Sequence, residues 1–195
     1  MKDRVMPKKL ILLIGAPGSG KSTDAKMISE RHEGKVTSYS TGDLIKEEIE
    51  KGTGIGSIAK SFVDKGNLVP TQAVVEIIVS AINAASTPVV LLDGFPGKEK
   101  QLQYFCDYIF THDKIDVISV LEIKVDENLA KRRWLASGRS EEIFEHEMAS
   151  YKASLAEIEA HYAEKDVLKI IDGERDLDIV IADIDSYLES ICTSF

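Results

Sequence analysis

Cysteine is scarce in this 195-residue chain, which contains only Cys106 and Cys192. The two lie far apart and form no Cys-x-x-Cys motif, which disfavours both a disulfide framework and a zinc site. The four histidines likewise show no metal-ligand spacing. This cysteine usage fits the reducing environment of the cytoplasm. We therefore expect a cytoplasmic protein without zinc.

Positive charge is also in short supply, because 24 Lys and Arg residues face 33 Asp and Glu residues and the formal net charge is −9. Since nucleic acid is bound through a basic surface, we do not expect it as a partner. A few local cations can still hold a small anion. The apolar run at residues 10–14 is too short for a secretory core or a membrane span. The chain is therefore expected to have no targeting peptide and no membrane partner.

The composition is that of a globular domain, with 44% hydrophobic and 29% charged residues. No internal repeat and no long linker divides residues 1–195, so we expect one domain. Four apolar runs bounded by turn residues, and a weaker, more polar one at residues 36–40, predict strands buried on both faces. They lie at residues 10–14, 36–40, 88–92, 117–123 and 167–171.

Amphipathic stretches between these runs predict helices. The alternation indicates an α/β fold in which a five-stranded parallel sheet has helices on both faces. Two of the helices follow the second strand without a strand between them, which suggests an inserted helical subdomain on the rim. The predicted helices are residues 23–31, 44–51, 58–65, 73–85, 101–110, 127–136, 141–164 and 177–192.

The stretch GAPGSGKST (residues 15–23) directly follows the first apolar run and matches the phosphate-binding pattern G-x-x-x-x-G-K-[ST]. Glycines let backbone N–H groups turn toward a phosphate, and the following helix N-terminus adds a positive dipole end. Lys21 is expected to reach the β- and γ-phosphates of ATP, Ser22 to bind magnesium, and Thr23 to contact the α-phosphate. The alternative is a turn that binds nothing. The predicted ATP contacts here are Gly18, Ser19, Gly20, Lys21, Ser22 and Thr23.

An acidic residue, Asp93, ends the apolar run in VVLLDGFPG (residues 89–97). The carboxyl ends of strands line the ligand crevice of an open parallel sheet, so Asp93 is placed to hold the waters of a magnesium shell. The alternative is an aspartate that caps a turn before Gly94.

Five motifs occur in the order and approximate spacing found in the adenylate kinases, from residue 9 to about residue 191: GAPGSGKST, YSTGDLIKEEI, GNLVP, LLDGFPG and SGRSEE. The chain thus resembles that family. The resemblance implies a three-layer P-loop fold with a nucleoside-monophosphate-binding subdomain at about residues 40–70 and a short lid at about 134–141. It also implies a monomer that transfers phosphate from ATP to AMP, giving two ADP, with magnesium.

The resemblance further implies a second nucleotide site. Thr41 resembles the family's adenine-contacting threonine, and Gln101 stands where the family has an adenine-reading glutamine, although a solvated helix residue is the alternative there. A buried amide facing a purine discriminates strongly, because the wrong base leaves it unpaired. The implied AMP-binding residues are Thr41, Lys46, Asn67, Leu68, Val69, Gly94, Gly97, Gln101 and Arg139.

Several phosphate-binding arginines expected from the resemblance are missing. Lys46, Gly97 and Glu147 stand at three such positions, and Lys98 beside Gly97 is a possible substitute. Lysine keeps the charge but loses the forked donors, and a glutamate repels phosphate.

The arginines that remain are Arg133, with Arg132 as an alternative, and Arg139. With Lys21, Arg133 and Arg139 are the implied catalytic residues.

The segment IIDGERD (residues 170–176) resembles the family's loop beside the ATP base, which makes Gly173 and Arg175 candidates. A plain strand-to-helix turn is the alternative. The segment between the helices at 127–136 and 141–164 is too short for a long lid, and its Trp134 is placed either to stack on adenine or to pack against its neighbours.

Two classes of function follow. The first is an active adenylate kinase with a weakened acceptor site. The second is a catalytically impaired relative that binds ATP and responds to it. A kinase for a different nucleoside monophosphate is a further alternative within the first class.

Overall fold

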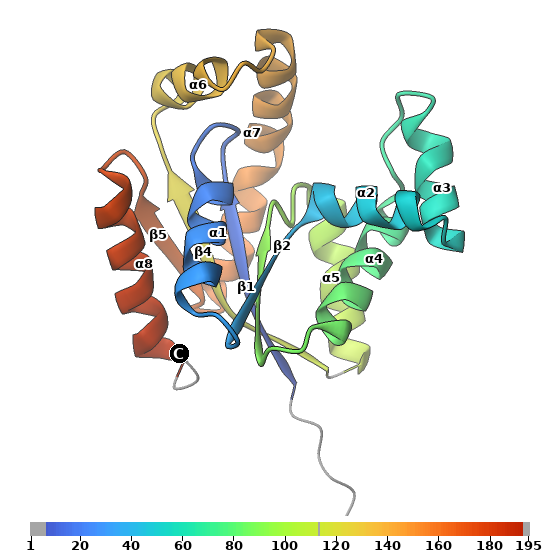
Figure 1. Cartoon of the computed structure of the whole chain (residues 1–195), viewed down its shortest axis with the longest axis horizontal. Helices are drawn as coiled ribbons and strands as arrows, with labels where there is room; N and C mark the ends of the chain where they lie inside the picture. Colours follow the sequence, from blue (N-terminus) through green and yellow to red (C-terminus); the bar gives the residue numbers. More distant parts are fainter. Residues whose placement is uncertain (1–6, 113, 193–195) are drawn as a thin grey trace, which may run out of the picture.

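Five parallel strands form one sheet in the computed structural model, which describes residues 7–112 and 114–192 (Figure 1). The sheet order is β2-β3-β1-β4-β5. All five predicted strands are confirmed, and the α/β fold with them. The strands are β1 (Lys8–Gly15), β2 (Val36–Ser40), β3 (Val89–Asp93), β4 (Ile115–Lys124) and β5 (Leu168–Asp172).

Each predicted helix is also present, with ends that differ by a few residues. The first begins two residues earlier than predicted because Gly20, at φ 102°, ends the preceding loop and leaves Lys21 as the first helical residue. The helices are α1 (Lys21–Arg31), α2 (Thr41–Lys51), α3 (Gly54–Val63), α4 (Thr71–Ala84), α5 (Glu99–His112), α6 (Glu127–Ala136), α7 (Glu141–Glu164) and α8 (Leu177–Ile191).

Both faces of the sheet are covered, which explains why the inner strands β1 and β3 carry continuous apolar runs. Successive residues of a strand point to opposite faces. Leu10, Leu12 and Ile14 of β1 pack in one core with α4, α5 and the C-terminal half of α7. Ile11 and Leu13 pack in the other core with α1 and α8. The fold therefore has three layers.

Helices α2 and α3 extend away from the sheet, whereas α6 lies beyond the carboxyl ends of the strands (Figure 1). Side-chain oxygens cap both extending helices: Ser40 accepts from the Asp43 amide before α2, and Thr53 accepts from the Gly56 amide before α3. Such caps stabilise a helix by about 1 kcal/mol each, which helps two helices that share little of the central core.

The carboxyl ends of β1 and β3 are neighbours, because Leu13 pairs in register with Asp93. The glycine-rich loop after β1 and the acidic end of β3 therefore meet at one edge of the sheet. None of the helices formed by residues 7–112 and 114–192 combines the length and apolar character needed to cross a bilayer.

Candidate active site

Close backbone packing accounts for the glycines of the loop between β1 and α1. Gly18 has φ 78°, and a Cβ atom built on it would lie 2.2 Å from the carbonyl oxygen of Ala130 in α6. A side chain there would be strained by its backbone conformation and would also collide with the α6 backbone. The loop thus turns tightly beneath α6 and leads directly into the N-terminus of α1, which is an arrangement suited to binding anions.

Lys21 lies at the first position of α1, and its Nζ atom donates to the Ala16 carbonyl oxygen over 3.3 Å. Burial lowers the pKa of this ammonium group, while the carboxylates of Asp93 and Glu147 act in the opposite direction. Because burial disfavours the charged form of this lysine, a phosphate ligand beside it would stabilise the ammonium group.

A cavity of about 320 Å³ opens over the loop. Its lining combines the loop and the start of α1 with cations from the α6–α7 region. The predicted ATP-contacting residues that line it are Gly18, Gly20, Lys21, Ser22, Thr23 and Arg133, and Arg139 and Glu147 line it too. Ser19 is buried instead, and its Oγ atom has no hydrogen-bond partner in the described part of the chain.

Ser22 and Asp93, the two predicted magnesium-binding residues, are in contact: the Ser22 hydroxyl donates to Asp93 Oδ2 over 2.5 Å. Asp93 is only 5% exposed, and its other oxygen has no hydrogen-bond partner among residues 7–112 and 114–192. The amide of Gly94 bonds to the Leu13 carbonyl oxygen, so the Asp93 side chain does not cap that turn. An unpaired buried carboxylate oxygen beside a hydroxyl fits a hard cation such as Mg²⁺.

No group of three or more His, Cys, Asp or Glu side chains in the described ranges is placed to hold a metal ion. A magnesium ion at Ser22 and Asp93 would therefore need water and phosphate oxygens to complete its ligands, as magnesium sites commonly do.

A second cavity, of about 300 Å³, adjoins the first. Lys21, Glu147 and Pro17 line both, and on the far side the second is lined by Gly94, Gly97, Lys98 and Gln101. A lysine shared by two cavities is placed to touch two ligands at once.

Gln101 has a defined role in this wall, since its Oε1 atom accepts the Gly97 amide over 2.8 Å. Its amide nitrogen is thereby left as a donor. Gln101 also lines a larger cavity of about 800 Å³ beneath α2 and α3. Asn67, Leu68 and Val69 line that cavity, as the resemblance implies.

Two implied acceptor residues lie outside these walls. Thr41 donates to the backbone oxygen of Asp93 over 3.1 Å and is not among the described residues that line the cavities. Lys46 is exposed on α2 and is likewise absent from those walls. In this structure Thr41 is hydrogen-bonded to the end of β3, and Lys46 does not line either of the two cavities that share Lys21.

Arg133, rather than Arg132, faces the site. It donates from Nη1 to the backbone oxygens of Ser19 (3.2 Å) and Gly173 (2.9 Å), whereas Arg132 is exposed. Arg133 thus ties the glycine-rich loop to the loop after β5. A further cavity of about 230 Å³ lies between these loops and is lined by Gly173 and Arg175. Arg175 also pairs with Asp183 over 2.6 Å.

Comparison with known proteins decides the family. The adenylate kinase family model matches residues 13–167. The adenylate kinase of Sulfurovum sp. (strain NBC37-1) is 40% identical over 194 residues, which cover 94% of this chain and 98% of that protein. That of a Nitratiruptor species is 40% identical over 185 residues (93% and 95%), and that of Campylobacter fetus subsp. fetus (strain 82-40) is 38% identical over 188 residues (94% and 98%). This chain belongs to the adenylate kinase family.

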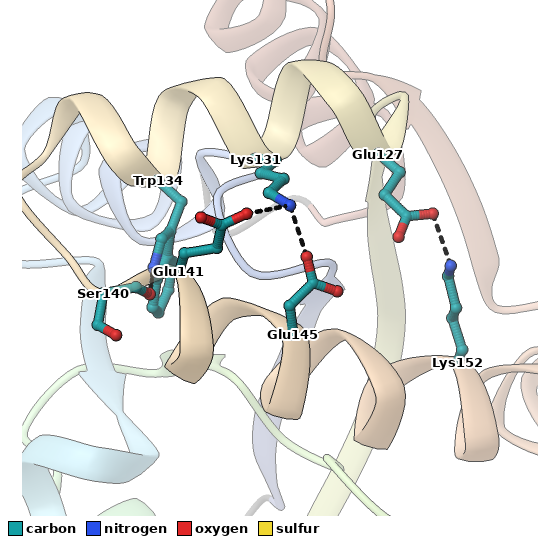
Figure 2. Close-up of polar contacts among 7 residues, drawn as sticks. All are labelled: Glu127, Lys131, Trp134, Ser140, Glu141, Glu145 and Lys152. Atoms are coloured by element: carbon teal, nitrogen blue, oxygen red, sulfur yellow. Dashed lines mark hydrogen bonds and ion pairs between the residues drawn. The ribbon is translucent and has the colours of Figure 1, made fainter.

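Within this adenylate kinase fold, ion pairs hold helices α6 and α7 together (Figure 2). Lys131 pairs with Glu141 (2.7 Å) and Glu145 (2.6 Å), and Lys152 pairs with Glu127 (2.6 Å). These neighbouring carboxylates raise the pKa of Lys131. The pairs are exposed to solvent, so they orient the two helices more than they stabilise the fold.

Trp134 completes this junction: it is 5% exposed and also lines the cavity over the glycine-rich loop. Its ring packs on Phe144, and its Nε1 atom donates to the Ser140 carbonyl oxygen over 2.8 Å (Figure 2). The Arg139 guanidinium lies 4.6 Å from the ring centroid, a cation–π contact. Trp134 thus packs against its neighbours, and stacking on adenine stays a prediction.

Two residues of this adenylate kinase site were not singled out from the sequence. Asp24 on α1 is 2% exposed and lines the cavity beside Gly173, and burial raises its pKa to about 6. Tyr151 on α7 lines the cavity shared with Lys21. The four-residue spacing from Glu147 to Tyr151, which places both on one helix face, is the signal that could have revealed the tyrosine.

Proposed function

We propose that this chain transfers the γ-phosphoryl group of ATP to AMP, giving two ADP, with magnesium bound to ATP. The observation that carries the proposal is that Lys21 lines two adjoining cavities, one over the glycine-rich loop and one bounded by Gly94, Gly97 and Gln101. Phosphoryl transfer needs the donor and acceptor phosphates in line, with cations between them.

On the donor side, the backbone of residues 18–20 and the N-terminus of α1 hold the ATP phosphates, and Arg133 and Arg139 add positive charge. Arg133 also positions Gly173 and Arg175 beside the nucleotide. Ser22 and Asp93 hold magnesium, largely through water. Magnesium, when bound, neutralises charge on the phosphate oxygens. No protein nucleophile is required, because positioning and electrostatic stabilisation supply the catalysis.

On the acceptor side, Gln101 is the adenine-reading residue, and the backbone of Asn67, Leu68 and Val69 borders the base. Thr41 acts there once α2 and α3 move inward. Residues 40–70 form the acceptor-binding subdomain and residues 134–141 the lid of one domain. Because water must be excluded during transfer, both close when the two nucleotides bind. We further propose a monomeric protein that works in the cytoplasm.

The acceptor site is weaker than that of a fully arginine-lined kinase. Gly97 has no side chain to bind the acceptor phosphate, and the negative charge of Glu147 repels a phosphate in the same cavity. Lys98 lines the same cavity and offers partial compensation. We therefore expect ordinary ATP affinity with weak AMP binding.

The test is a coupled assay of ADP formation from ATP with AMP, CMP, UMP or GMP as acceptor. AMP should give the highest kcat/KM, because the amide of Gln101 stays paired only with the correct base. Gln101→Ala should reduce this preference, while Gln103→Ala, on the exposed side of the same helix, should not. A pyrimidine monophosphate as best acceptor would overturn the assignment of AMP.

A further inference from the structure

Little positive charge lines the acceptor side of the site. The cavity of about 300 Å³ beside the glycine-rich loop has Lys21 and Lys98 as the cations of its described lining, and Glu147 as its carboxylate. None of the described residues that line this cavity is an arginine. The cavity over the loop, by contrast, is lined by Lys21 together with Arg133 and Arg139. The donor polyphosphate thus has a strongly cationic site, whereas the neighbouring cavity is better suited to a ligand without a phosphate.

The other walls of this acceptor cavity are apolar or neutral. Gln101 has a free amide nitrogen there, because its Oε1 atom already accepts the Gly97 amide. Ser150 and Tyr151 add hydroxyl groups, and the apolar lining is Ile14, Pro17, Pro96, Leu155 and Ile158. Apolar walls with a few polar groups are typical of sites that bind small organic molecules. An uncharged nucleoside matches this lining, since its base is flat and apolar on both faces and its edges and hydroxyl groups form hydrogen bonds.

Glu147 on α7 lies where the two cavities join. It lines both of them, as Lys21 does, and its side chain is exposed. In the proposed function Lys21 contacts the γ-phosphate of ATP. An acceptor atom that attacks this phosphate from the neighbouring cavity therefore lies beside the carboxylate of Glu147.

The effect of this carboxylate depends on the acceptor. AMP attacks through a phosphate oxygen that is already ionised, so it needs no base, and its charge is repelled by Glu147. A hydroxyl group must instead lose its proton as it attacks, and kinases that phosphorylate hydroxyl groups place an aspartate to accept that proton. The side chain that weakens AMP binding is thus the kind of group that an alcohol acceptor requires.

We propose that this cavity also accepts an uncharged nucleoside, whose 5′-hydroxyl group is phosphorylated by ATP with Glu147 as the general base. The hydroxyl oxygen bonds to the γ-phosphorus, and the bond from that phosphorus to the oxygen bridging it to the β-phosphate breaks. The hydroxyl proton passes to Glu147, which is exposed and releases it to water. The products are a nucleoside monophosphate, ADP and a proton. Because ATP at the glycine-rich loop is the donor, the inference rests on that part of the proposed function, but not on AMP as acceptor.

Adenosine labelled in its base, mixed with ATP, magnesium and the whole protein, tests this reaction. Labelled AMP should form, together with labelled ADP if the AMP is phosphorylated again, and the sum of the two measures the first transfer. Labelled guanosine, cytidine and uridine are compared under the same conditions. Glu147→Gln keeps the size of the side chain but removes the base, so it should lower kcat/KM for the nucleoside by about 10²- to 10⁴-fold. Glu147→Asp should retain part of the activity. Glu164→Gln, at the exposed end of the same helix, is the matched control and should leave the rate unchanged.

The direction of the effect distinguishes a base from a structural residue. Glu147→Gln should lower the rate with the nucleoside and raise the rate with AMP, whereas damage to the fold would lower both. Phosphorylation of any of the four nucleosides that depends on Glu147 supports the inference. No labelled nucleotide from any of them, or phosphorylation that Glu147→Gln leaves intact, would overturn it. ADP released from ATP without a labelled nucleotide would show that water is the acceptor, which also overturns it. Transfer to added AMP is measured in a separate reaction, so either result can fail without the other.

Discussion

Replacing Glu147 by glutamine and by arginine should raise kcat/KM for AMP in two separable steps. Glu147 lines both cavities and is exposed, so water screens its repulsion of a phosphate to about 1 kcal/mol, or about fivefold in rate. Glu147→Gln should recover that factor. Glu147→Arg should add a charge-assisted hydrogen bond of about 1.5–3 kcal/mol, a further 10- to 150-fold by the same conversion. Steady-state kinetics with AMP varied at saturating ATP measures both steps.

A change in pH dependence should accompany the gain. The carboxylate of Glu147 raises the pKa of Lys21 against the larger lowering caused by burial. Removing that carboxylate lets the pKa of Lys21 fall further, so the lysine loses its charge at a lower pH. The alkaline decline of kcat should therefore move to lower pH in Glu147→Gln. The variant should gain at neutral pH and lose part of that gain at high pH.

The matched control is Glu164→Arg, which makes the same charge change at the exposed end of α7, away from the cavities. It should leave kcat/KM unchanged. Gly97→Arg offers a second route to the same phosphate: a Cβ atom there would meet Gln101 Oε1 at 3.6 Å, an ordinary contact. In the double variant, the gain in kcat/KM should be smaller than the two single gains combined, because both arginines would bind one phosphoryl group. No gain from either Glu147 variant would show that this side chain does not face the acceptor phosphate.

Three further substitutions or measurements test the donor site and its motions. Lys21→Ala should abolish productive ATP binding and turnover, whereas Lys26→Ala, exposed on the same helix, should not; an active Lys21→Ala would refute the phosphate-binding loop. Gly18→Ala should lower the melting temperature more than Gly34→Ala. Both glycines have φ near 78°, so alanine costs about 1–2 kcal/mol at either position, but only at Gly18 would the new Cβ atom collide with the backbone of α6. Equal losses of melting temperature would contradict the close packing of Gly18 against α6. Small-angle scattering should show compaction when a two-nucleotide analogue binds, as α2 and α3 close; an unchanged radius of gyration would refute their mobility.

Much of the fold could be predicted because its strands are buried on both faces. A strand between two layers of helices is apolar on both faces, as residues 10–14 of β1 and residues 89–92 of β3 are. The phosphate-binding loop was equally predictable, because its glycines adopt backbone conformations that few other residues can adopt. Gly18 illustrates this, because both its positive φ and the nearby Ala130 carbonyl oxygen exclude a side chain.

What the sequence did not reveal are contacts that depend on how distant elements pack. Glu122 is one polar residue in an apolar run, and only the position of α7 shows that the Tyr151 hydroxyl donates to it. The choice of Arg133 over Arg132 likewise depends on how α6 is rotated above the loop. Lys46 follows the correct motif yet is exposed on α2, away from the cavities that share Lys21, because a motif specifies order along the chain and not the orientation of a helix.

The most direct test of the account follows the transferred atoms. ATP labelled at its γ-phosphate is mixed with AMP, magnesium and the protein, and the products are separated. The account predicts label in the β-phosphate of one of the two ADP molecules formed per ATP consumed. This labelling should depend strictly on AMP and should be lost in Lys21→Ala. Normal ATP binding without transfer of label to AMP or any other nucleoside monophosphate would contradict it and would identify an ATP-binding protein that is not a kinase.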